Sequence, residues 1–189
     1  MKKLLALTLL IFVPFSAYAQ WDLNNDSSSV HFISVKKASV GEVHTFSKIS
    51  GSINNGKASV KIDLSSVETN IPVRNERMKS MLFNIANFST ASISSEIMIN
   101  QLTNMKTGSI HHAKMDFDVK LHGVTKLIQI DVQIIKLNPH TVLVASTAPF
   151  ILKAKDFQLA EGIEALRNIA KLPSISTAVP VSFSLVFTK

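Results

Sequence analysis

Apolar and polar residues alternate with a period of two along most of this 189-residue chain. Between Met115 and Leu121, and again between Ile128 and Ile134, every second side chain is apolar. This pattern is typical of antiparallel strands that have one face in water and the other in a core. Turn-forming residues such as Asn54-Asn55-Gly56 separate the runs. The pattern predicts about eight strands, over 30–35, 43–53, 58–64, 91–99, 115–121, 128–134, 141–152 and 179–187.

Eight one-sided strands must bury their apolar faces, and two architectures can do this. A closed barrel leaves no exposed strand edge, whereas two stacked sheets leave edges that need protection. The alternation alone fits both. Two helical segments favour the barrel, because a barrel has a mouth that helices can cover. We therefore expect an all-β fold, an eight-stranded antiparallel barrel with two short lid helices.

The first lid helix is expected within the stretch VETNIPVRNERMKSMLF, residues 67–83. Here the alternation stops, and Met78, Met81 and Leu82 fall on one helical face together with Arg74. Methionine is a flexible side chain that suits a surface facing a variable ligand, although such a stripe is more often ordinary core. Arg74 is expected either to contact a ligand head group or to hold the loop by binding backbone carbonyls or an acid such as Glu68.

The second lid helix is expected over residues 159–170. Leu159, Ile163 and Leu166 recur at helical spacing and form one apolar face. Acidic residues lie near its start and basic residues near its end, which is the arrangement that the helix dipole favours. Pro173 ends the pattern.

The first nineteen residues have the features of a secretory signal peptide. Lys2 and Lys3 precede an apolar run, and Ala17-Tyr18-Ala19 places small residues where a signal peptidase reads them. We predict cleavage after Ala19 and a single periplasmic domain over residues 20–189. The chain contains no cysteine, which excludes disulfides, thiolate catalysis and cysteine-ligated metals.

Removal of Lys2 and Lys3 lowers the formal net charge from +7 to +5. The remaining basic residues are scattered and are not interleaved with aromatic residues, so we expect no nucleic-acid partner. Weak attraction to an anionic lipid surface stays open.

The chain resembles the YceI family of periplasmic, lipocalin-like proteins. The resemblance rests on SSVETNIPVRNERMKSMLF (65–83), on FDVKLHGVTK (117–126) and on KDFQL (155–159), and it extends from Trp21 to the last strand. Three departures are plain: Asn75 stands where an aspartate is usual, Leu82 replaces a residue that is usually polar, and the late Arg-Ser-Asp-Phe-Gly pattern has become KAKDFQ (153–158). These changes bear on the head group of the ligand more than on the fold.

The resemblance implies a lipocalin-like barrel whose apolar interior holds a long-chain isoprenoid or acyl lipid, such as a prenyl quinone, a polyprenyl chain or a fatty acyl amide. Only a long chain buries enough surface, since each methylene contributes about 0.8 kcal/mol while association costs roughly 4–15 kcal/mol. We expect a periplasmic carrier that needs no cofactor. A transient contact with the membrane surface or with a membrane cytochrome, and a homodimer, stay open, as does an interaction module that binds no lipid.

The ligand-binding residues are expected on the apolar strand faces and on the two lids. They are Phe32, Phe46, Ile62, Leu64, Arg74, Met78, Met81, Leu82, Phe117, Val119, Phe157, Leu159, Ile163 and Leu166.

An enzyme is the alternative class, and the sequence offers little for it. There is no GxSxG motif and no HExxH motif, and we expect no catalytic residue and no metal site. His111 and His112 are neighbours on a strand and point to opposite faces. His44, two residues after Glu42, could act as a general base, but we expect it on the water-facing side of its strand. The stretch DLNND, residues 22–26, lacks the glycine and glutamate of a calcium loop and predicts a polar turn.

Overall fold

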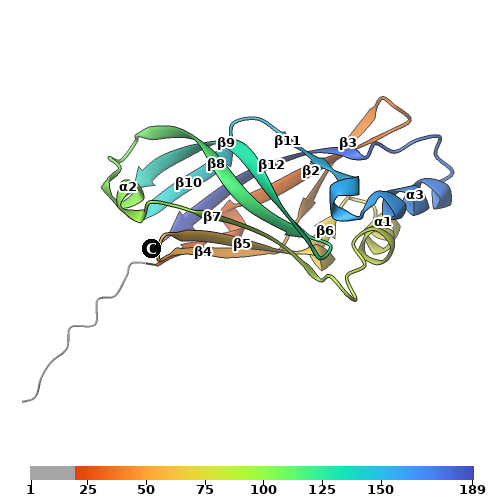
Figure 1. The fold of residues 1–189 in the computed structure, drawn as a ribbon, viewed down its shortest axis with the longest axis horizontal. Coiled ribbons are helices and arrows are strands. Elements are labelled where there is room, and N and C mark those ends of the chain that lie inside the picture. The colour runs from red at the N-terminus through yellow and green to blue at the C-terminus, as the bar shows by residue number, and fades with distance from the viewer. Residues whose placement is uncertain (1–19) are drawn as a thin grey trace, which may run out of the picture.

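The computed structural model describes residues 20–189, and the predicted signal peptide lies outside this part of the chain. The described residues form strands and a few short helices (Figure 1). The strands are β1 (Trp21–Leu23), β2 (Ser29–Lys36), β3 (Val40–Phe46), β4 (Ile49–Asn54), β5 (Lys57–Asp63), β6 (Val67–Glu68), β7 (Thr90–Glu96), β8 (Ile110–Leu121), β9 (Val124–Asn138), β10 (Thr141–Ser146), β11 (Phe150–Lys153) and β12 (Ala178–Thr188). The α-helices are α1 (Pro72–Arg77), α2 (Ile99–Asn104) and α3 (Ala160–Ile169).

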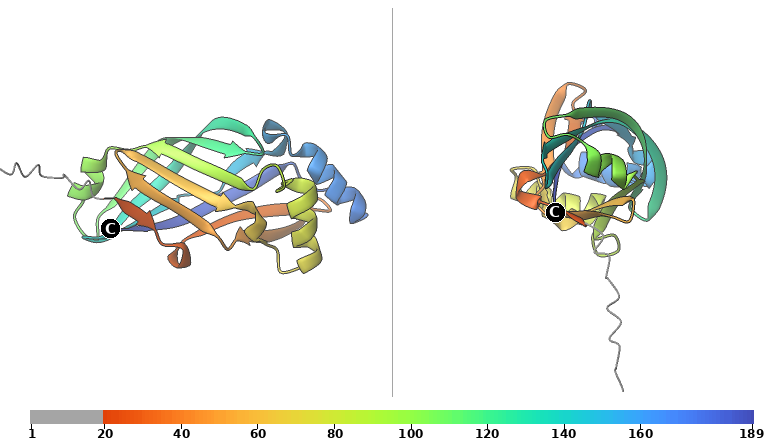
Figure 2. Two further views of the ribbon diagram at one scale, coloured as in Figure 1. Left: turned by 90° about the horizontal axis from the view of Figure 1, so that it is seen from below. Right: turned by 90° about the vertical axis from the view of Figure 1, so that its left-hand side faces the viewer.

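The sheet closes into a barrel because β1 pairs on both of its edges. Trp21 pairs with Ile53 of β4, and Leu23 pairs with Phe187 of β12. From β4 the antiparallel pairing continues through β5, β7, β8, β9 and β10 and returns to β12. The view along the barrel shows the closed ring (Figure 2). The predicted eight-stranded antiparallel barrel is confirmed.

Three of the eight barrel strands are interrupted. β1 and β2 both pair with β12 and form one bent strand, with a 3-10 turn (Asn25–Ser27) between them. β3 with β4, and β10 with β11, are interrupted in the same way. Asn25 connects the interruption between β1 and β2 with the one between β3 and β4. Its side chain accepts a hydrogen bond from Ile49 N at 2.8 Å and donates one to Ser47 O at 3.2 Å. The predicted runs 43–53 and 141–152 are therefore single barrel strands with a bend in each.

The two ends of the barrel differ. α1 and α3 lie at one end, beside the β2–β3 hairpin, and α2 lies at the other (Figure 1). Strand β7 ends at Glu96, so the predicted strand over 91–99 is too long, and no helix was predicted where α2 lies. A six-residue helix with one buried side chain, Leu102, is too short to show a helical period.

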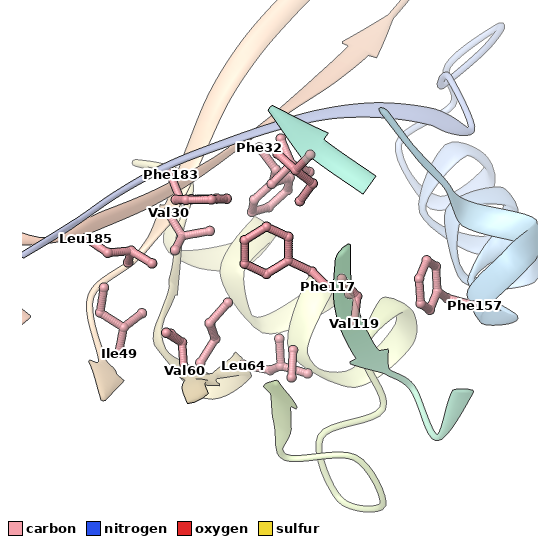
Figure 3. Packing of buried hydrophobic residues seen from close by; sticks show 14 of the residues in the cluster. Val30, Phe32, Ile49, Val60, Leu64, Phe117, Val119, Phe157, Phe183 and Leu185 are labelled. Carbon is pink, nitrogen blue, oxygen red and sulfur yellow. The ribbon is translucent and has the colours of Figure 1, made fainter. Parts of the chain in front are cut away.

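The end of the barrel nearest α2 is filled by side chains. Trp21, Ile53, Val132, Val142 and Phe187 are each at most 2% exposed. Towards the middle, Phe183 packs edge-on against Phe117, with ring centroids 6.1 Å apart (Figure 3). These two aromatic rings lie across the interior, at the boundary between the filled end and the other half of the barrel. The opposite half of the barrel, under α1 and α3, is hollow.

Among residues 20–189, no helix combines the length and hydrophobicity that crossing a membrane requires.

Candidate functional site

The hollow half of the barrel is a cavity of about 370 Å³. This volume lies near the lower limit of pockets that hold small molecules, about 300–1,000 Å³. The wall is apolar and comes from β2, β3, β5, β7, β8, β11 and β12. Because side chains of successive strand residues point to opposite faces, every second residue of these strands reaches the interior.

Two lids border the cavity at the barrel mouth. The first is α1 continued by a π-helical segment (Met78–Leu82), and the second is the 3-10 turn Ala154–Phe157 followed by α3. The lids touch each other at Gly162 of α3. A Cβ atom on this glycine would lie 2.7 Å from Met81 O and 2.9 Å from Leu82 Cα, so only a glycine permits this backbone approach. The predicted pair of lid helices is present at the mouth.

Twelve of the fourteen predicted ligand-binding residues line the cavity. They are Phe32, Phe46, Ile62, Leu64, Arg74, Met78, Leu82, Val119, Phe157, Leu159, Ile163 and Leu166.

Met81 and Phe117 do not line it. Phe117 lies on the α2 side of the cavity, where it packs against Phe183. Met81 leaves the predicted stripe because the helix changes to π winding at Met78, shown by the hydrogen bond from Phe83 N to Met78 O at 2.9 Å. The wider winding turns residue 81 out of the register that a regular α-helix would give.

Arg74 fastens the first lid to the barrel wall. Its Nη1 donates to Glu42 Oε2 at 2.6 Å, and its Nη2 donates to Thr69 O at 2.6 Å. Lys36 Nζ lies 2.7 Å from the same Glu42 oxygen. The prediction that Arg74 binds a backbone carbonyl and an acid agrees with these contacts, but Glu68 is the wrong acid.

Glu68 is occupied by the lid itself. Its Oε1 accepts hydrogen bonds from Asn70 N and from the Asn75 amide, at 2.5 Å and 3.1 Å. The Asn75 Oδ1 accepts two further hydrogen bonds from Thr69, from N at 2.9 Å and from the hydroxyl at 2.6 Å. The amide at position 75 both donates and accepts here, which an ionised aspartate cannot do.

The polar residues of the lining lie on β2, on β3, on α1 of the first lid and on the segment between α3 and β12. They are Ser34, Lys36, Glu42, His44, Arg74, Arg77 and Ser176. His44 is only 2% exposed, so its predicted place on the water-facing side of the strand is wrong. The signal was in the sequence: Phe46 was expected to face inwards, and strict alternation then places His44 and Glu42 on that face too.

Burial and neighbouring charges set the ionisation states of His44 and Glu42. Burial lowers the pKa of His44, and the charges of Arg74 and Lys36 lower it further against the opposing effect of Glu42. Partial burial acts to raise the pKa of Glu42, but the hydrogen bond from Lys36 and the charge of Arg74 outweigh it and the pKa is lowered. Glu42 is thus held as a carboxylate and His44 as a neutral imidazole near pH 7.

The described residues contain no group of side chains arranged to bind a metal ion. Across residues 20–189, no three His, Asp or Glu side chains are grouped closely enough to hold an ion. Only the second half of the stretch 22–26 forms the predicted polar turn, because Asp22 and Leu23 belong to β1. In this turn the Asn24 side chain accepts a hydrogen bond from Ser27 N at 3.1 Å.

The family model of the YceI-like domain matches residues 21–187. A solved structure described as a polyisoprenoid binding domain from Saccharophagus degradans, implicated in plant cell wall breakdown, is 36% identical to the chain. It superposes with a TM-score of 0.88 over 90% of this chain and 98% of that one. No curated protein matches the sequence.

Two more distant structures share the fold. BcnA of Burkholderia cenocepacia is 17% identical, with a TM-score of 0.67 over 87% of this chain and 98% of that one. A YceI protein of Campylobacter jejuni is 16% identical, with a TM-score of 0.55 over 77% of this chain and 84% of that one.

Proposed function

Since the chain belongs to the family of YceI-like domains, we propose that it binds a long-chain isoprenoid or related lipid and carries it through the periplasm. The hydrocarbon chain lies in the hollow half of the barrel, and the polar end lies near the mouth. The observation that carries this proposal is the cavity itself, which is apolar in its depth and polar only near α1 and α3. The polyisoprenoid named for the Saccharophagus domain supports the same ligand class.

The filled half of the barrel limits how the chain is held. A cavity of about 370 Å³ takes a hydrocarbon segment, and the rest of a longer chain stays at the mouth under the lids. Burial of apolar surface is the driving force, at about 0.8 kcal/mol for each methylene. A binding protein needs no more than this, and we infer that the chain is a carrier and not an enzyme.

The test begins with the protein purified from its own host. Extraction into organic solvent followed by mass analysis should release a chain with isoprenoid or acyl character. A delipidated sample should then bind a prenyl quinone, measured by displacement of a fluorescent fatty-acid probe. A clean extract together with no uptake in the titration would reject lipid binding.

Two variants in which phenylalanine replaces an alanine test whether the lipid binds in the cavity. Ala91 lines the cavity, so Ala91→Phe should fill it and weaken binding at least tenfold. Ala113 packs on the same core without lining the cavity, and Ala113→Phe is the matched control. Equal losses in both variants would place the lipid elsewhere. Circular dichroism verifies that each variant is folded.

We further propose that the mouth docks on an anionic membrane surface. Ten large apolar side chains are exposed among residues 20–189, and five of them lie on the hairpin, α1 or α3 around the mouth: Val40, Val43, Ile71, Val73 and Ile169. Lys37 and Lys171 are exposed on the same segments. Apolar side chains rimmed by basic ones suit an interface with anionic lipid.

Sedimentation with vesicles tests the docking. Binding should require anionic phosphatidylglycerol, weaken with salt, and fall several-fold in the double variant Val43→Ser/Val73→Ser. The double variant Met98→Ser/Ile110→Ser removes two exposed apolar residues beside α2, at the opposite end of the barrel, and should bind like the wild type. Equal binding by all three proteins contradicts docking through the mouth.

A further inference from the structure

His44 is a buried polar residue in an apolar cavity, and one of its ring nitrogens has nothing to bind. The side chain lines the cavity and is 2% exposed. Its ring packs against Phe32, with centroids 5.1 Å apart. Nε2 lies 2.9 Å from Ser34 Oγ, but Nδ1 has no hydrogen-bond partner within residues 20–189. A buried polar atom without a partner costs free energy unless something supplies the missing bond.

The contact with Ser34 indicates which nitrogen carries the proton. His44 Nε2 is the hydrogen-bond partner of the Ser34 hydroxyl in the described chain. We assign the partly buried Ser34 hydroxyl as the donor of this hydrogen bond and Nε2 as the acceptor. In a neutral imidazole the proton then sits on Nδ1, so Nδ1 is a donor that faces no acceptor.

Arg74 adds a second unused donor to the same end of the cavity. Its Nε is buried and has no partner within residues 20–189, while Nη1 and Nη2 are occupied by Glu42 and Thr69. Glu42, which binds Arg74, is two residues from His44 on β3 and shares its face of the strand, so both unused donors lie at the same end of the cavity. What this group lacks is an acceptor.

We propose that His44 is the head-group residue of the cavity and that its Nδ1–H donates to one uncharged oxygen, a carbonyl, at the polar end of the bound chain. This inference rests on the proposed lipid binding and adds the chemical class of the head group. Arg74 Nε–H is positioned to assist as a second donor to the head group.

The contacts of Arg74 argue against its binding an anionic head group. A phosphate or carboxylate is bound best by a free guanidinium fork, and Arg74 has both of its terminal nitrogens engaged, so an anion would have to be held by Arg77, the other arginine of the lining. A carbonyl oxygen needs one or two donors and carries no charge, which matches what is unused here.

Ligands of equal chain length but different head groups test lipid binding and head-group recognition by His44 separately. We would compare a C17 methyl ketone, the C17 alkane and the C17 carboxylate in the probe-displacement assay. The wild type should prefer the ketone over the alkane, and His44→Phe, which keeps an aromatic ring but removes the polar nitrogens, should reduce the ratio of ketone affinity to alkane affinity about tenfold. Failure of every ligand to bind the wild type refutes the proposed function instead of this inference.

Two results would overturn the head-group assignment alone. One is a ketone preference that survives in His44→Phe; the other is tightest binding of the carboxylate. Should His44→Phe fail to fold, nitrogen-15 NMR of the wild-type histidines gives the same answer. Adding ketone should shift the protonated Nδ1 resonance of His44, and Ser34→Ala, which removes the Nε2 partner, should reduce the ketone preference. An unshifted resonance contradicts the assignment.

Discussion

Glu42 Oε2 on β3 lies 2.6 Å from Arg74 Nη1 on α1, a contact across 32 residues of sequence that joins the barrel wall to the first lid. The same oxygen also binds Lys36, and both side chains of the Glu42–Arg74 pair are about three-quarters buried. Partial burial makes such a pair stronger than one exposed to solvent.

A double-mutant cycle measures this lid contact. Arg74→Ala, Glu42→Ala and the double variant should give a coupling free energy of about 1–2 kcal/mol in urea unfolding, because a hydrogen-bonded, partly buried pair is lost. Lys79–Glu76 is an exposed pair on the first lid and provides the control, with about 0.3–0.5 kcal/mol. Equal coupling in the two cycles would mean that the contact does not hold the lid.

The buried imidazole of His44 should make stability depend on pH. Burial, with the charges of Arg74 and Lys36, lowers its pKa in the folded state from the ordinary 6.5, against the opposing Glu42. The unfolded chain therefore binds more protons below pH 6.5, and stability should be full above pH 6.5 and fall as the pH drops towards the lowered pKa.

Urea midpoints at pH 7.5, 6.5 and 5.5 check this dependence. His44→Phe should flatten it, and the exposed His111→Phe should leave it intact. The pH stays above 5 because the carboxylate of Glu42, whose pKa is lowered from 4.5, loses its contribution only at lower pH. A pH dependence unchanged in His44→Phe would assign it to another group.

Lys136 is the costliest charge in the filled half of the barrel. It is 2% exposed, its Nζ has no hydrogen-bond partner within residues 20–189, and it lies 4.4 Å from the centre of the Trp21 ring. Burial lowers its pKa, and the charge of Lys189 adds to this. The unfolded lysine then binds more protons below pH 10.5, so stability should rise with pH from the lowered pKa up to 10.5.

Lys136→Met should remove that rise and stabilise the fold by about 1–4 kcal/mol at pH 7, as exchanges of buried charge for apolar side chains do. Lys120→Met, at an exposed position of β8, is the control and should change stability little. A less stable Lys136→Met would show that attraction to the Trp21 ring exceeds the cost of burial.

Gly162 offers a prediction with a reversed sign. Glycine to alanine inside a helix normally stabilises by about 0.5–1 kcal/mol. Here the added Cβ would meet backbone atoms of Met81 and Leu82, so Gly162→Ala should destabilise by about 1–3 kcal/mol in urea unfolding. Glu161→Ala, on the exposed face of α3, should stay within about 0.5 kcal/mol. A stabilised Gly162→Ala would mean that the lids separate easily.

The size of the cavity should appear as a plateau in chain-length dependence. In a series of methyl ketones, affinity should rise about fourfold for each methylene until the cavity is filled, and then level off. Ala91→Phe should move the plateau to shorter chains. A rise without a plateau would show that the filled half of the barrel opens to admit longer ligands.

Strand alternation predicted the barrel well, because a side-chain period of two depends only on which face meets water. The same rule located most of the cavity lining, from Phe32 on β2 to Val119 on β8. It predicts a face, however, and not how deeply a residue lies along the barrel. Phe117 and Val119 share one face of β8, yet only Val119 borders the cavity.

Partners that are distant in sequence were beyond prediction. The acid that binds Arg74 is set by where α1 packs on β3, and the nearer Glu68 was the natural choice until Asn75 proved to occupy it. Likewise, the π winding after Met78 follows from tertiary packing, which local spacing does not record.

The filled end of the barrel has a further consequence for how a ligand enters and leaves. Within residues 20–189, Trp21 and its neighbours fill the interior at the α2 end, so a ligand that enters at the mouth must leave by the same route. Donor and recipient would then compete for the same face and could not hold the protein at once. Such a molecule works as a shuttle that releases one partner before meeting the next, and not as a conduit between two.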